Sequence, residues 1–542
     1  MIPHSQTAVQ LVGPDRLALN SAKPIPAPGP RQILAQVECV GLCASDMKLL
    51  HQFDRHARKT PVLAHLGADV LAGIPSYVPD GAPTVPGHEA VLRVVAVGAG
   101  VTTVVPGGRY LVQADFRDLR TANSNGAFGY NFEGGLQQWV LLDERVTVSA
   151  TGESYLLPVP DERSASQLAL VEPWACVEDA FAVRERRTLR AGGRLLLEVA
   201  PDFANNLAGI DLEPCSARLT IGASTVGFTP IRLDTPAGQR FDDIIYIGND
   251  PARVELLFSL LAKDGLMLIA TAGRKFGRRL TLPIGRVHYG NVRISATTSG
   301  RPADALAAIP VSGELRPGDH VNVVGAGGPM GVMAMVRAIA ASRSGALVEG
   351  GVRSVARASA LRERVEAVAA ARGVRTRLFN PETDTPKGQV DYCFLMAPVP
   401  DLVDKAVADA ADEGVINVFA GIPADVPVAI DLDAYAAKKL YLIGTSGSTM
   451  EDMRVVLGKV LDDRLDTNLS VAAVCGMAGA IAGLNAVRDK TIPGKIMVYP
   501  RLTDLPLLEL PALAERYPSV GAKYEGGCWT RAAEAELLRI AG

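Results

Sequence analysis

An internal repeat in the second half of the chain limits the possible folds more than any other feature of the sequence. Residues 189–195 (LRAGGRL) resemble residues 315–321 (LRPGDHV), and residues 241–266 resemble residues 390–415. The offset grows from 126 residues (315 minus 189) to 149 residues (390 minus 241), so the first copy is 23 residues shorter in between. A repeat of about 130 residues indicates a duplicated domain rather than a solenoid.

Each copy alternates predicted strands with predicted helices and closes on a similar turn, residues 297–300 (TTSG) and 444–447 (GTSG). Apolar runs such as residues 266–270 (LMLIA) have no polar face, which is typical of parallel strands buried on both sides. The repeat therefore predicts an α/β fold with two tandem doubly wound parallel sheets, in residues 185–312 and 313–451.

The second copy carries a glycine-rich turn between a strand (residues 321–324) and a helix (residues 332–341). Glycines let the backbone approach a pyrophosphate, whose charge then meets the N-terminus of the helix. Two registers fit this turn: Gly325 and Gly327 with Gly331, or Ala326 and Gly328 with Gly331. The predicted cofactor-binding residues are Gly325, Gly327, Gly328, Pro329, Met330, Gly331, Glu349, Arg353 and Ser446.

At the same place the first copy reads EVAPD, residues 198–202. This segment has no glycine, and it puts two carboxylates where the phosphates would lie. The missing 23 residues fall in the same half of the copy. We interpret the first copy as a degenerate Rossmann-type domain that no longer binds a dinucleotide.

Three motifs in the first third of the chain contain the ligand types of a catalytic zinc site: residues 41–46 (GLCASD), 86–89 (PGHE) and 172–176 (EPWAC). They offer a thiolate, an imidazole and two carboxylates. A cysteine such as Cys43 is, taken alone, more often a small buried apolar residue. The order and local contexts of the motifs favour a metal site. The candidate metal ligands are Cys43, His88, Glu89 and Glu172.

Taken together, these motifs resemble those of the zinc-dependent medium-chain dehydrogenases, most closely the polyol branch that includes sorbitol dehydrogenase and L-sorbose 1-phosphate reductase. The resemblance covers roughly residues 25–185 and 313–500. It implies a GroES-like, β-rich catalytic domain in residues 1–184. Residues 452–542 would complete this domain and add a C-terminal extension.

The resemblance also implies roles for single residues. Cys43 and His88 would bind the zinc, Glu89 would be a ligand or a close support, and Glu172 would bind directly or through water. Ser45 would pass the alcohol proton to solvent. Asp46 would accept the second N–H of the imidazole and fix its tautomer.

Many zinc dehydrogenases add a four-cysteine lobe that binds a structural zinc. Residues 90–175 contain no cysteine, so we expect one catalytic zinc and no structural zinc. Residues 129–136 (GYNFEGGL) are similar to the polyol branch, and they fit a substrate cleft and a plain glycine-rich loop equally well. We interpret His51, His56 and His65 as surface or loop residues.

The choice between NAD and NADP stays open. An acid about 20 residues after the glycines would bind the ribose hydroxyls of NAD, and Glu349 is the candidate. Alignment by the downstream helix instead puts Val352 at the selecting position, with Arg353 next to it. An arginine there could accept a 2′-phosphate.

Composition excludes several classes of protein. A chain of 542 residues is too long for one core, and its net charge of −3 shows no basic excess for nucleic acid. We see no signal peptide and no apolar run of the roughly 18 residues that a membrane span requires. The seven cysteines are scattered, which suits a reducing cytoplasm. A homo-oligomer is possible. In the family, paired domains of this type meet across a dimer interface, so the duplication could build an internal pseudo-dimer.

We therefore predict a zinc-dependent oxidoreductase that transfers a hydride between a secondary alcohol of a polyol or sugar, phosphorylated or not, and NAD(P). Two alternatives remain at this point. The same zinc could serve a redox-neutral epimerase or lyase, or the scaffold could be a non-catalytic binding protein.

Overall fold

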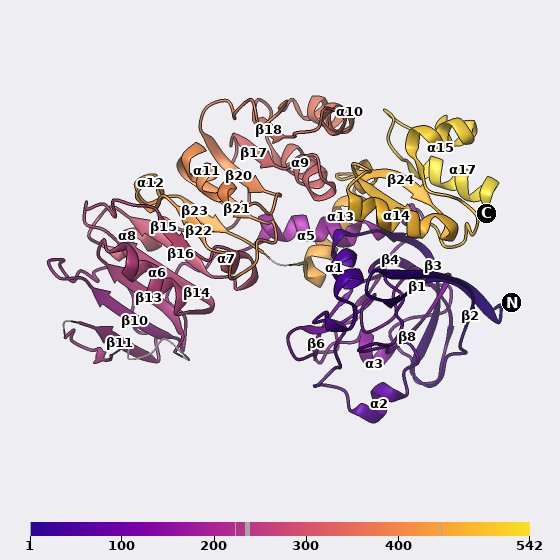
Figure 1. Cartoon of the computed structure of the whole chain (residues 1–542), viewed down its shortest axis with the longest axis horizontal. Coiled ribbons are helices and arrows are strands. Elements are labelled where there is room, and N and C mark those ends of the chain that lie inside the picture. The colour runs from indigo at the N-terminus through magenta and orange to yellow at the C-terminus, as the bar shows by residue number, and fades with distance from the viewer. Residues whose placement is uncertain (1, 223, 233–238, 446) are drawn as a thin grey trace. The chain divides into compact units, whose positions relative to one another are not determined.

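A computed structural model (Figure 1) describes residues 2–222, 224–232, 239–445 and 447–542. The chain divides into two compact units. Unit 1 comprises Met1–Ala175 and Ser448–Gly542, and unit 2 comprises Cys176–Gly447. No helix in the described part of the chain combines the length and the apolar character that a bilayer crossing needs.

Unit 1 is built on an eight-stranded, mostly antiparallel sheet. Its strand order is β26 (Leu508–Glu509), β24 (Val471–Cys475), β25 (Lys495–Val498), β3 (Gln32–Gly41), β4 (Glu89–Val97), β5 (Arg109–Val112) and β9 (Leu156–Pro158), with β8 (Trp139–Asp143) paired to β3. Two hairpins flank this sheet: β1 (Ser5–Gly13) with β2 (Arg16–Pro24), and β6 (Asp115–Arg120) with β7 (Asn125–Ala127). Residues from both ends of the sequence thus share one sheet.

The helices of unit 1 are mostly short. They are α1 (Ala44–Gln52), α2 (Ala68–Ala72), α3 (Glu144–Thr147), α4 (Ala165–Ala169), α13 (Met450–Leu461), α14 (Met477–Asp489), α15 (Leu510–Arg516), α16 (Pro518–Gly521) and α17 (Arg531–Ala541), with 3-10 turns η1 (Phe53–Arg55) and η2 (Thr467–Ser470). Helix α5 (Val171–Ala182) starts in unit 1 and ends in unit 2.

The C-terminal extension is an integral part of unit 1. Trp529 is fully buried and donates to Ser166 Oγ and Tyr499 Oη, both at 3.2 Å. The buried carboxylate of Glu534 accepts hydrogen bonds from the backbone N–H groups of Ala165 (2.5 Å) and Ser166 (2.9 Å). These N–H groups open helix α4, where an acidic side chain is favoured. The extension therefore closes the core of unit 1.

Unit 2 contains the two predicted parallel sheets, which confirms the tandem architecture. The first consists of β12 (Thr229–Pro230), β11 (Ala217–Ile221), β10 (Arg194–Val199), β13 (Phe241–Ile247), β14 (Leu261–Ala270) and β16 (Arg293–Thr297), in that order. The second consists of β19 (Arg375–Phe379), β18 (Leu347–Gly351), β17 (Val321–Val324), β20 (Val390–Leu395), β21 (Ala410–Val418) and β23 (Tyr441–Ile443). Numbered along the chain, each sheet has the order 3-2-1-4-5-6 of a Rossmann domain.

The helices distinguish the two copies. The first copy has α6 (Pro251–Ser259), α7 (Gly285–Tyr289) and α8 (Pro302–Ala307), and the second has α9 (Pro329–Ala341), α10 (Val355–Arg372), α11 (Asp401–Asp409) and α12 (Leu432–Ala437). The second copy connects its first three strands through α9 and α10. In the first copy the described residues 200–216, between β10 and β11, contain no helix. The 23 residues that the first copy lacks therefore fall where the second copy has helices between its first strands.

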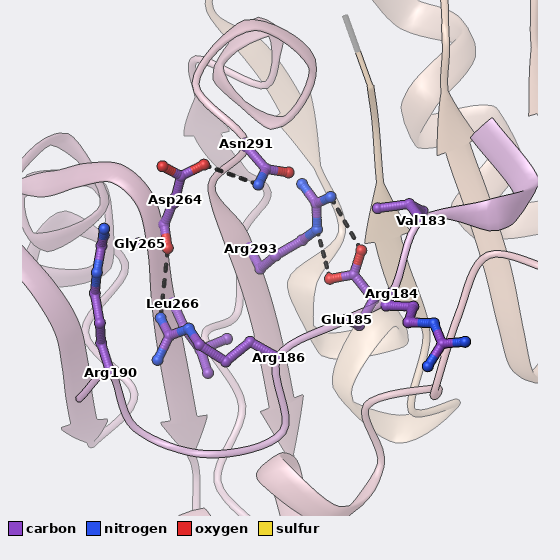
Figure 2. Close-up of a pocket in the computed structure, with 10 residues that line it drawn as sticks. All are labelled: Val183, Arg184, Glu185, Arg186, Arg190, Asp264, Gly265, Leu266, Asn291 and Arg293. Carbon is purple, nitrogen blue, oxygen red and sulfur yellow. Dashed lines mark hydrogen bonds and ion pairs between the residues drawn. The ribbon is translucent and has the colours of Figure 1, made fainter. Parts of the chain in front are cut away.

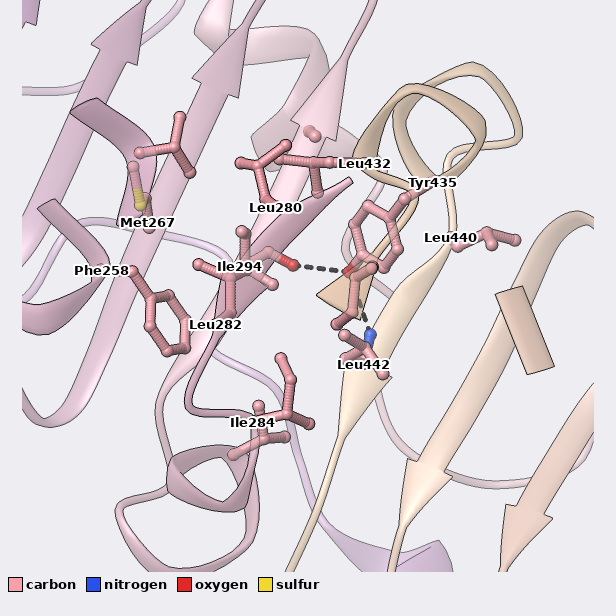
Figure 3. Close-up of a cluster of buried hydrophobic side chains, with 14 of the residues drawn as sticks. Phe258, Met267, Leu280, Leu282, Ile284, Ile294, Leu432, Tyr435, Leu440 and Leu442 are labelled. Atoms are coloured by element: carbon pink, nitrogen blue, oxygen red, sulfur yellow. Dashed lines mark hydrogen bonds between the residues drawn. The ribbon is translucent and has the colours of Figure 1, made fainter. Parts of the chain in front are cut away.

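The two copies pack against each other through their sixth strands. The edge strands β16 and β23 lie in contact, and two short strands, β15 (Leu280–Leu282) and β22 (Val428–Ile430), pair antiparallel from one copy to the other. A common core of buried apolar side chains spans both copies (Figure 3). The Tyr435 hydroxyl donates to Ile294 O (2.8 Å) on β16 and accepts from Leu442 N (3.0 Å) on β23. This contact is the arrangement that the pseudo-dimer hypothesis expects.

A buried ion pair adds a polar link between the copies. Arg293 on β16 donates two hydrogen bonds to Glu185, at 2.7 and 3.0 Å, in the wall of a pocket of about 290 Å³ (Figure 2). The Tyr441 hydroxyl on β23 donates to the same carboxylate at 2.7 Å. Both charged side chains are at least 93% buried. Such a pair is costly to break from one side, because the remaining charge stays buried and unpaired.

Candidate active site

The first motif forms the start of helix α1. Cys43 is its N-cap residue, and the Asp46 carboxylate accepts a hydrogen bond from Cys43 N at 3.2 Å through Oδ2. The other oxygen of Asp46 lies 3.0 Å from His88 Nδ1. Asp46 is fully buried. One carboxylate therefore fixes the position of the thiol and of the imidazole, and its acceptance of the Nδ1 proton leaves Nε2 available as a metal ligand.

Strand pairing brings the second motif to the first. Strands β3 and β4 are antiparallel, with Gly41 opposite Glu89 and His88 just before β4. A Cβ atom at Gly41 would collide with the Glu89 carboxylate, so the glycine of the first motif makes room for the acid of the second. Cys43, His88 and Glu89 each offer a ligand atom, and these atoms lie within 4.8 Å of one another.

Ser45 lies at the centre of this group. Its hydroxyl donates to Cys43 Sγ at 3.1 Å and lies 3.2 Å from His88 Nε2. Burial alone would lower the pKa of His88, but the adjacent Asp46 carboxylate and the ring of Tyr130 raise it well above its usual value. In the metal-free protein the imidazole therefore holds a proton that a metal ion must displace.

Lys495 is a site residue that the sequence reasoning missed. It starts β25, is 2% exposed, and its ammonium group forms an ion pair with Glu89 Oε1 and donates to Leu42 O at 3.1 Å. Burial would lower its pKa, but Glu89 and Cys43 raise it overall. Glu89 Oε2 is among the few buried side-chain atoms of the described residues that have no hydrogen-bond partner. That oxygen is thus available for a cation.

Glu172 starts α5 and interacts electrostatically with the same group. Burial raises the pKa of Glu172 to about 7, against the opposing charge of His88 and with a further upward contribution from Glu89. Its carboxylate is not part of the described cluster of ligand atoms. The structure thus brings together three of the four predicted metal ligands and places Glu172 in their electrostatic field.

The glycine-rich loop 129–136 covers this site with Tyr130. The ring of Tyr130 is 2% exposed and lies 5.8 Å from the ring of His88 and 5.1 Å from that of His56. Burial lowers the pKa of His56 to about 4, with Arg58 and Lys48 adding to the effect. His51 is exposed and lies 3.1 Å from Asp15, and His65 is also exposed. None of these three histidines joins the described ligand cluster.

In unit 2 the glycine turn has the shape that a pyrophosphate site requires. Gly325 has φ +83°, a Cβ atom at Gly327 would lie 2.7 Å from Val352 Cγ1, and one at Gly331 would lie 2.7 Å from Ala326 Cα. A Cβ atom at Gly328 has room, with Gly325 O at 3.8 Å as its nearest neighbour. These spacings favour the register of Gly325 and Gly327 with Gly331.

Helix α9 begins directly after this turn. Its N-cap is Gly328, followed by Pro329, and no side chain caps its first N–H groups. An uncapped N-terminus of a 13-residue helix offers free donors and a positive dipole end to phosphate. Two hydrogen bonds of 2.8 and 3.0 Å from Arg337 to Glu178 hold the helix in place.

The expectation for Glu349 needs correction. Glu349 is the third residue of β18 and is fully buried. It accepts hydrogen bonds from His320 Nε2 (2.6 Å) and Lys387 N (2.9 Å), and it pairs with Arg377. His320 precedes β17, so this carboxylate lies toward the amino end of the strands, whereas dinucleotides bind at the carboxyl end. Spacing along the sequence predicted an acid but not the edge of the sheet that it faces.

Arg353 and Ser446 are two further residues that we predicted to bind the cofactor. Arg353 follows β18 with a side chain that is 76% exposed and lies 3.7 Å from Glu382. Ser446 lies outside the described residues, so its assignment stays a prediction.

The first copy differs at the corresponding position. Glu198, near the end of β10, is 8% exposed and accepts two hydrogen bonds from Arg253, at 2.7 and 2.6 Å. Its counterpart in the second copy is Val324 (198 plus the offset of 126). In the first copy, the space next to the end of β10 is thus bordered by the carboxylate of Glu198, which is paired with Arg253.

Comparison with known proteins identifies the domain that carries the cluster of candidate metal ligands. A family model described as the alcohol dehydrogenase GroES-like domain matches residues 29–152. Unit 1 contains a GroES-like domain. The chain resembles the zinc-dependent medium-chain dehydrogenases, and the predicted fold class is confirmed.

Similar proteins come from the polyol and alcohol dehydrogenases. A sorbitol dehydrogenase from Gallus gallus is 35% identical over 91 residues, which cover 17% of this chain and 20% of that protein. An L-sorbose 1-phosphate reductase from Klebsiella pneumoniae is 28% identical over 156 residues, 27% of this chain and 36% of that protein. The chain thus spans about a fifth to about a third of these relatives.

The fold extends further than the sequence similarity. The crystal structure of 2R,3R-butanediol dehydrogenase from Bacillus subtilis superimposes with a TM-score of 0.53 at 16% identity. The superposition covers 92% of this chain and 100% of that one. The two chains therefore share a fold.

Proposed function

We propose that the chain is a zinc-dependent oxidoreductase that transfers a hydride between a secondary alcohol, of a polyol or sugar, and a nicotinamide dinucleotide. One observation supports this most strongly: the ligand atoms of Cys43, His88 and Glu89 converge within 4.8 Å in a GroES-like domain. The glycine turn before α9 supplies a second site in unit 2, of the kind that binds dinucleotides.

The residues present fit zinc. A thiolate, an imidazole and a carboxylate are the donors that zinc prefers, and its bonds of about 2.0–2.3 Å need donors that lie as close together as these do. The buried Glu89 Oε2, which has no partner among the described residues, supplies the anionic oxygen. When bound, zinc would act as a Lewis acid that makes a hydroxyl group easier to deprotonate.

Several side chains of the site orient or balance charge. Asp46 holds His88 with Nδ1 turned inward to its carboxylate, so Nε2 faces Ser45 and the ligand group. Ser45, hydrogen-bonded to the thiol, would pass the proton of a substrate hydroxyl to solvent. Lys495 offsets the negative charge of Cys43 and Glu89, and its ammonium group forms an ion pair with the Glu89 carboxylate.

The glycine turn and α9 would bind the pyrophosphate of the cofactor. Gly325 and Gly331 bring the backbone close, and the first N–H groups of α9 would donate to the phosphate oxygens. The bound nicotinamide would accept or supply the hydride. A polyol fits the carboxylate-rich metal site, because its neighbouring hydroxyl can bind the same cation.

Replacement of Cys43 tests the proposal. Cys43→Ser should abolish zinc content, measured by elemental analysis of the purified protein, and nicotinamide-linked oxidation of a polyol panel. Cys528→Ser, a half-buried cysteine in the C-terminal extension, is the matched control and should keep both. Full activity in Cys43→Ser contradicts the proposal. Zinc bound by the unaltered protein without any reduction of the nicotinamide would instead support the redox-neutral alternative.

The pH dependence of metal binding gives an independent readout. The pKa of His88 is raised in the folded, metal-free protein. Protonated His88 therefore stabilises this fold fully at pH values below about 6.5, the pKa of histidine in the unfolded chain. The stabilisation is lost as the pH rises through the raised pKa of the folded protein. Zinc binds only the neutral imidazole. Zinc affinity should therefore fall, with proton uptake on release, as pH is lowered from about 8 to about 6. A titration showing pH-independent affinity would contradict the role of His88 as a ligand.

A further inference from the structure

A second pocket of unit 2, with a volume of about 680 Å³, brings three cationic side chains together. Arg240, just before β13, Lys263, at the start of β14, and Arg286, in α7, line it from the first copy. Asp425, in the loop between β21 and β22, lines it from the second copy. None of the lining residues belongs to the glycine turn or to the cluster of candidate metal ligands. The pocket therefore shares no residue with either site described above.

Arg286 is half-buried, and its hydrogen bonds within the described part of the chain all go to backbone oxygens. Its two terminal nitrogens donate to Phe258 O (2.6 Å) and Leu261 O (2.5 Å), at the C-terminal end of α6. The guanidinium carbon lies 5.5 Å from the centre of the Phe258 ring. These contacts hold the guanidinium in place and use two of its five N–H donors. The other three are left for a ligand.

Arg286 also lacks the acidic partner that other arginines of unit 2 have. Burial lowers its pKa, and the nearby charge of Arg240 lowers it further. Arg293 and Arg337 are more deeply buried, but their carboxylate partners raise their pKa values. A bound anion would stabilise the charge of Arg286 in the way that those carboxylates stabilise theirs.

Arg240 and Lys263 add two exposed cations to the pocket. Neither forms an ion pair with a carboxylate of the described residues, and Arg240 donates only to Gln239 O, at 3.1 Å. Asp425 is the one acid among the lining residues, and it is exposed. Three cations and one acid give the lining a formal charge of +2 (3 minus 1).

A phosphate monoester matches both the charge and the size of this pocket. At pH 7 such a group carries a charge of about −1.5 to −2 and has three strong acceptor oxygens. Guanidinium groups bind phosphate oxygens in charge-assisted hydrogen bonds that are about twice as strong as neutral ones. The volume lies within the range of about 300–1,000 Å³ that is typical of sites for small molecules. A single carboxylate would balance only half of the formal charge.

We propose that this pocket binds a small organic phosphate, whose phosphate group lies between Arg240, Lys263 and Arg286. The inference does not rest on the proposed function, because no candidate zinc ligand and no residue of the glycine turn contributes to the pocket. A ligand that fills the pocket touches residues of both copies. It therefore stabilises the contact between the copies, since it binds only when they are folded together.

Isothermal titration of the purified full-length protein with methyl phosphate tests the proposal. This probe has no alcohol group, and it should bind with a Kd of about 1 mM or lower. The double variant Arg240→Ser/Lys263→Ser should weaken binding at least about tenfold, and it should keep its fold because both side chains are exposed. Arg286→Lys keeps the charge but loses the planar fork, and it should weaken binding at least about threefold. Arg343→Ser/Arg372→Ser, which removes two exposed arginines of the same unit outside the pocket, is the control and should bind as the unaltered chain does.

Inorganic phosphate and potassium chloride, at equal ionic strength, serve as comparison ligands. Binding of methyl phosphate that is at least as tight as that of inorganic phosphate supports an organic ligand, and tighter binding of inorganic phosphate overturns it. Equal affinity in the Arg240→Ser/Lys263→Ser variant and its control overturns the site. A titration that potassium chloride reproduces, or no binding at about 10 mM methyl phosphate, overturns it as well. These results involve neither zinc nor a nicotinamide, so failure here leaves the proposed function in place.

Discussion

The two Rossmann-type copies in unit 2 share one strand order and differ where a dinucleotide would bind. In the second copy β17 runs into glycines and then into the uncapped helix α9. In the first copy β10 ends beside a carboxylate held by Arg253, and residues 200–216 form no helix. The sheet, β16 and the strand β15 are nonetheless intact. The first copy has thus kept the parts that contact its neighbour and lost those that would bind a ligand.

This difference indicates what each part of such a domain does. The sixth strand and the β15–β22 ribbon bury a common apolar core, which needs only apolar side chains and an intact sheet edge. The cofactor turn needs glycines at defined places and a helix N-terminus. The contact between the copies does not need the glycines or the helix N-terminus. The first copy can therefore pack against the second without binding a nucleotide itself.

The largest expected effect concerns the contact that the copies share. Arg293→Met leaves the buried Glu185 without its cation and should destabilise unit 2 by about 3–5 kcal/mol. Chemical denaturation of the purified protein measures this change. Arg278→Met removes an exposed ion pair with Glu255 in the same unit and is the control. Equal stability of the two variants would show that the copies do not depend on this network.

A smaller effect should follow from a change in the turn of the second copy. Gly331→Val puts a branched side chain against Gly325 O and Ala326, which should cost about 1–3 kcal/mol and weaken nucleotide binding at least about tenfold. Fluorescence titration with NADPH and thermal unfolding measure both effects. Gly458→Val, at an open position in helix α13, should leave both unchanged. Unaltered nucleotide binding in Gly331→Val would show that the cofactor does not bind at this turn.

The smallest effect is expected in the first copy. Glu198→Gln combined with Arg253→Gln removes the charges beside β10, but the variant still lacks glycines and a helix at this place. Nucleotide stoichiometry and affinity should therefore match those of the unaltered chain. Appearance of an additional nucleotide site in this variant would show that charge alone silenced the first copy.

Much of this architecture follows from local sequence patterns. The repeat, the strand runs and the glycine turn predicted two parallel sheets. The order and local contexts of the GLCASD and PGHE motifs, together with the family resemblance, favoured a site that joins Cys43 and His88. Strand pairing brings these motifs together, because β3 and β4 are neighbours and place Gly41 opposite Glu89. Local patterns of this kind can be recognised in a single sequence, because the residues that form them are close together along the chain.

Other features depend on contacts that no local pattern encodes. Lys495 reaches Glu89 from 406 residues further along the chain, and no motif in the sequence pointed to this contact. Glu349 has the spacing of a ribose-binding acid, but His320 and Arg377 hold it toward the other edge of the sheet. Glu534, which binds the start of α4, belongs to the C-terminal extension, for which the sequence predicted no partner. Such roles become visible only when the tertiary neighbours are known.

The number of nucleotides bound per chain tests the contrast between the copies most directly. Isothermal titration of the full-length protein with NADPH should give one site per chain, and that site should disappear in Gly331→Val. Two sites per chain, or one site that persists in Gly331→Val, would contradict the account.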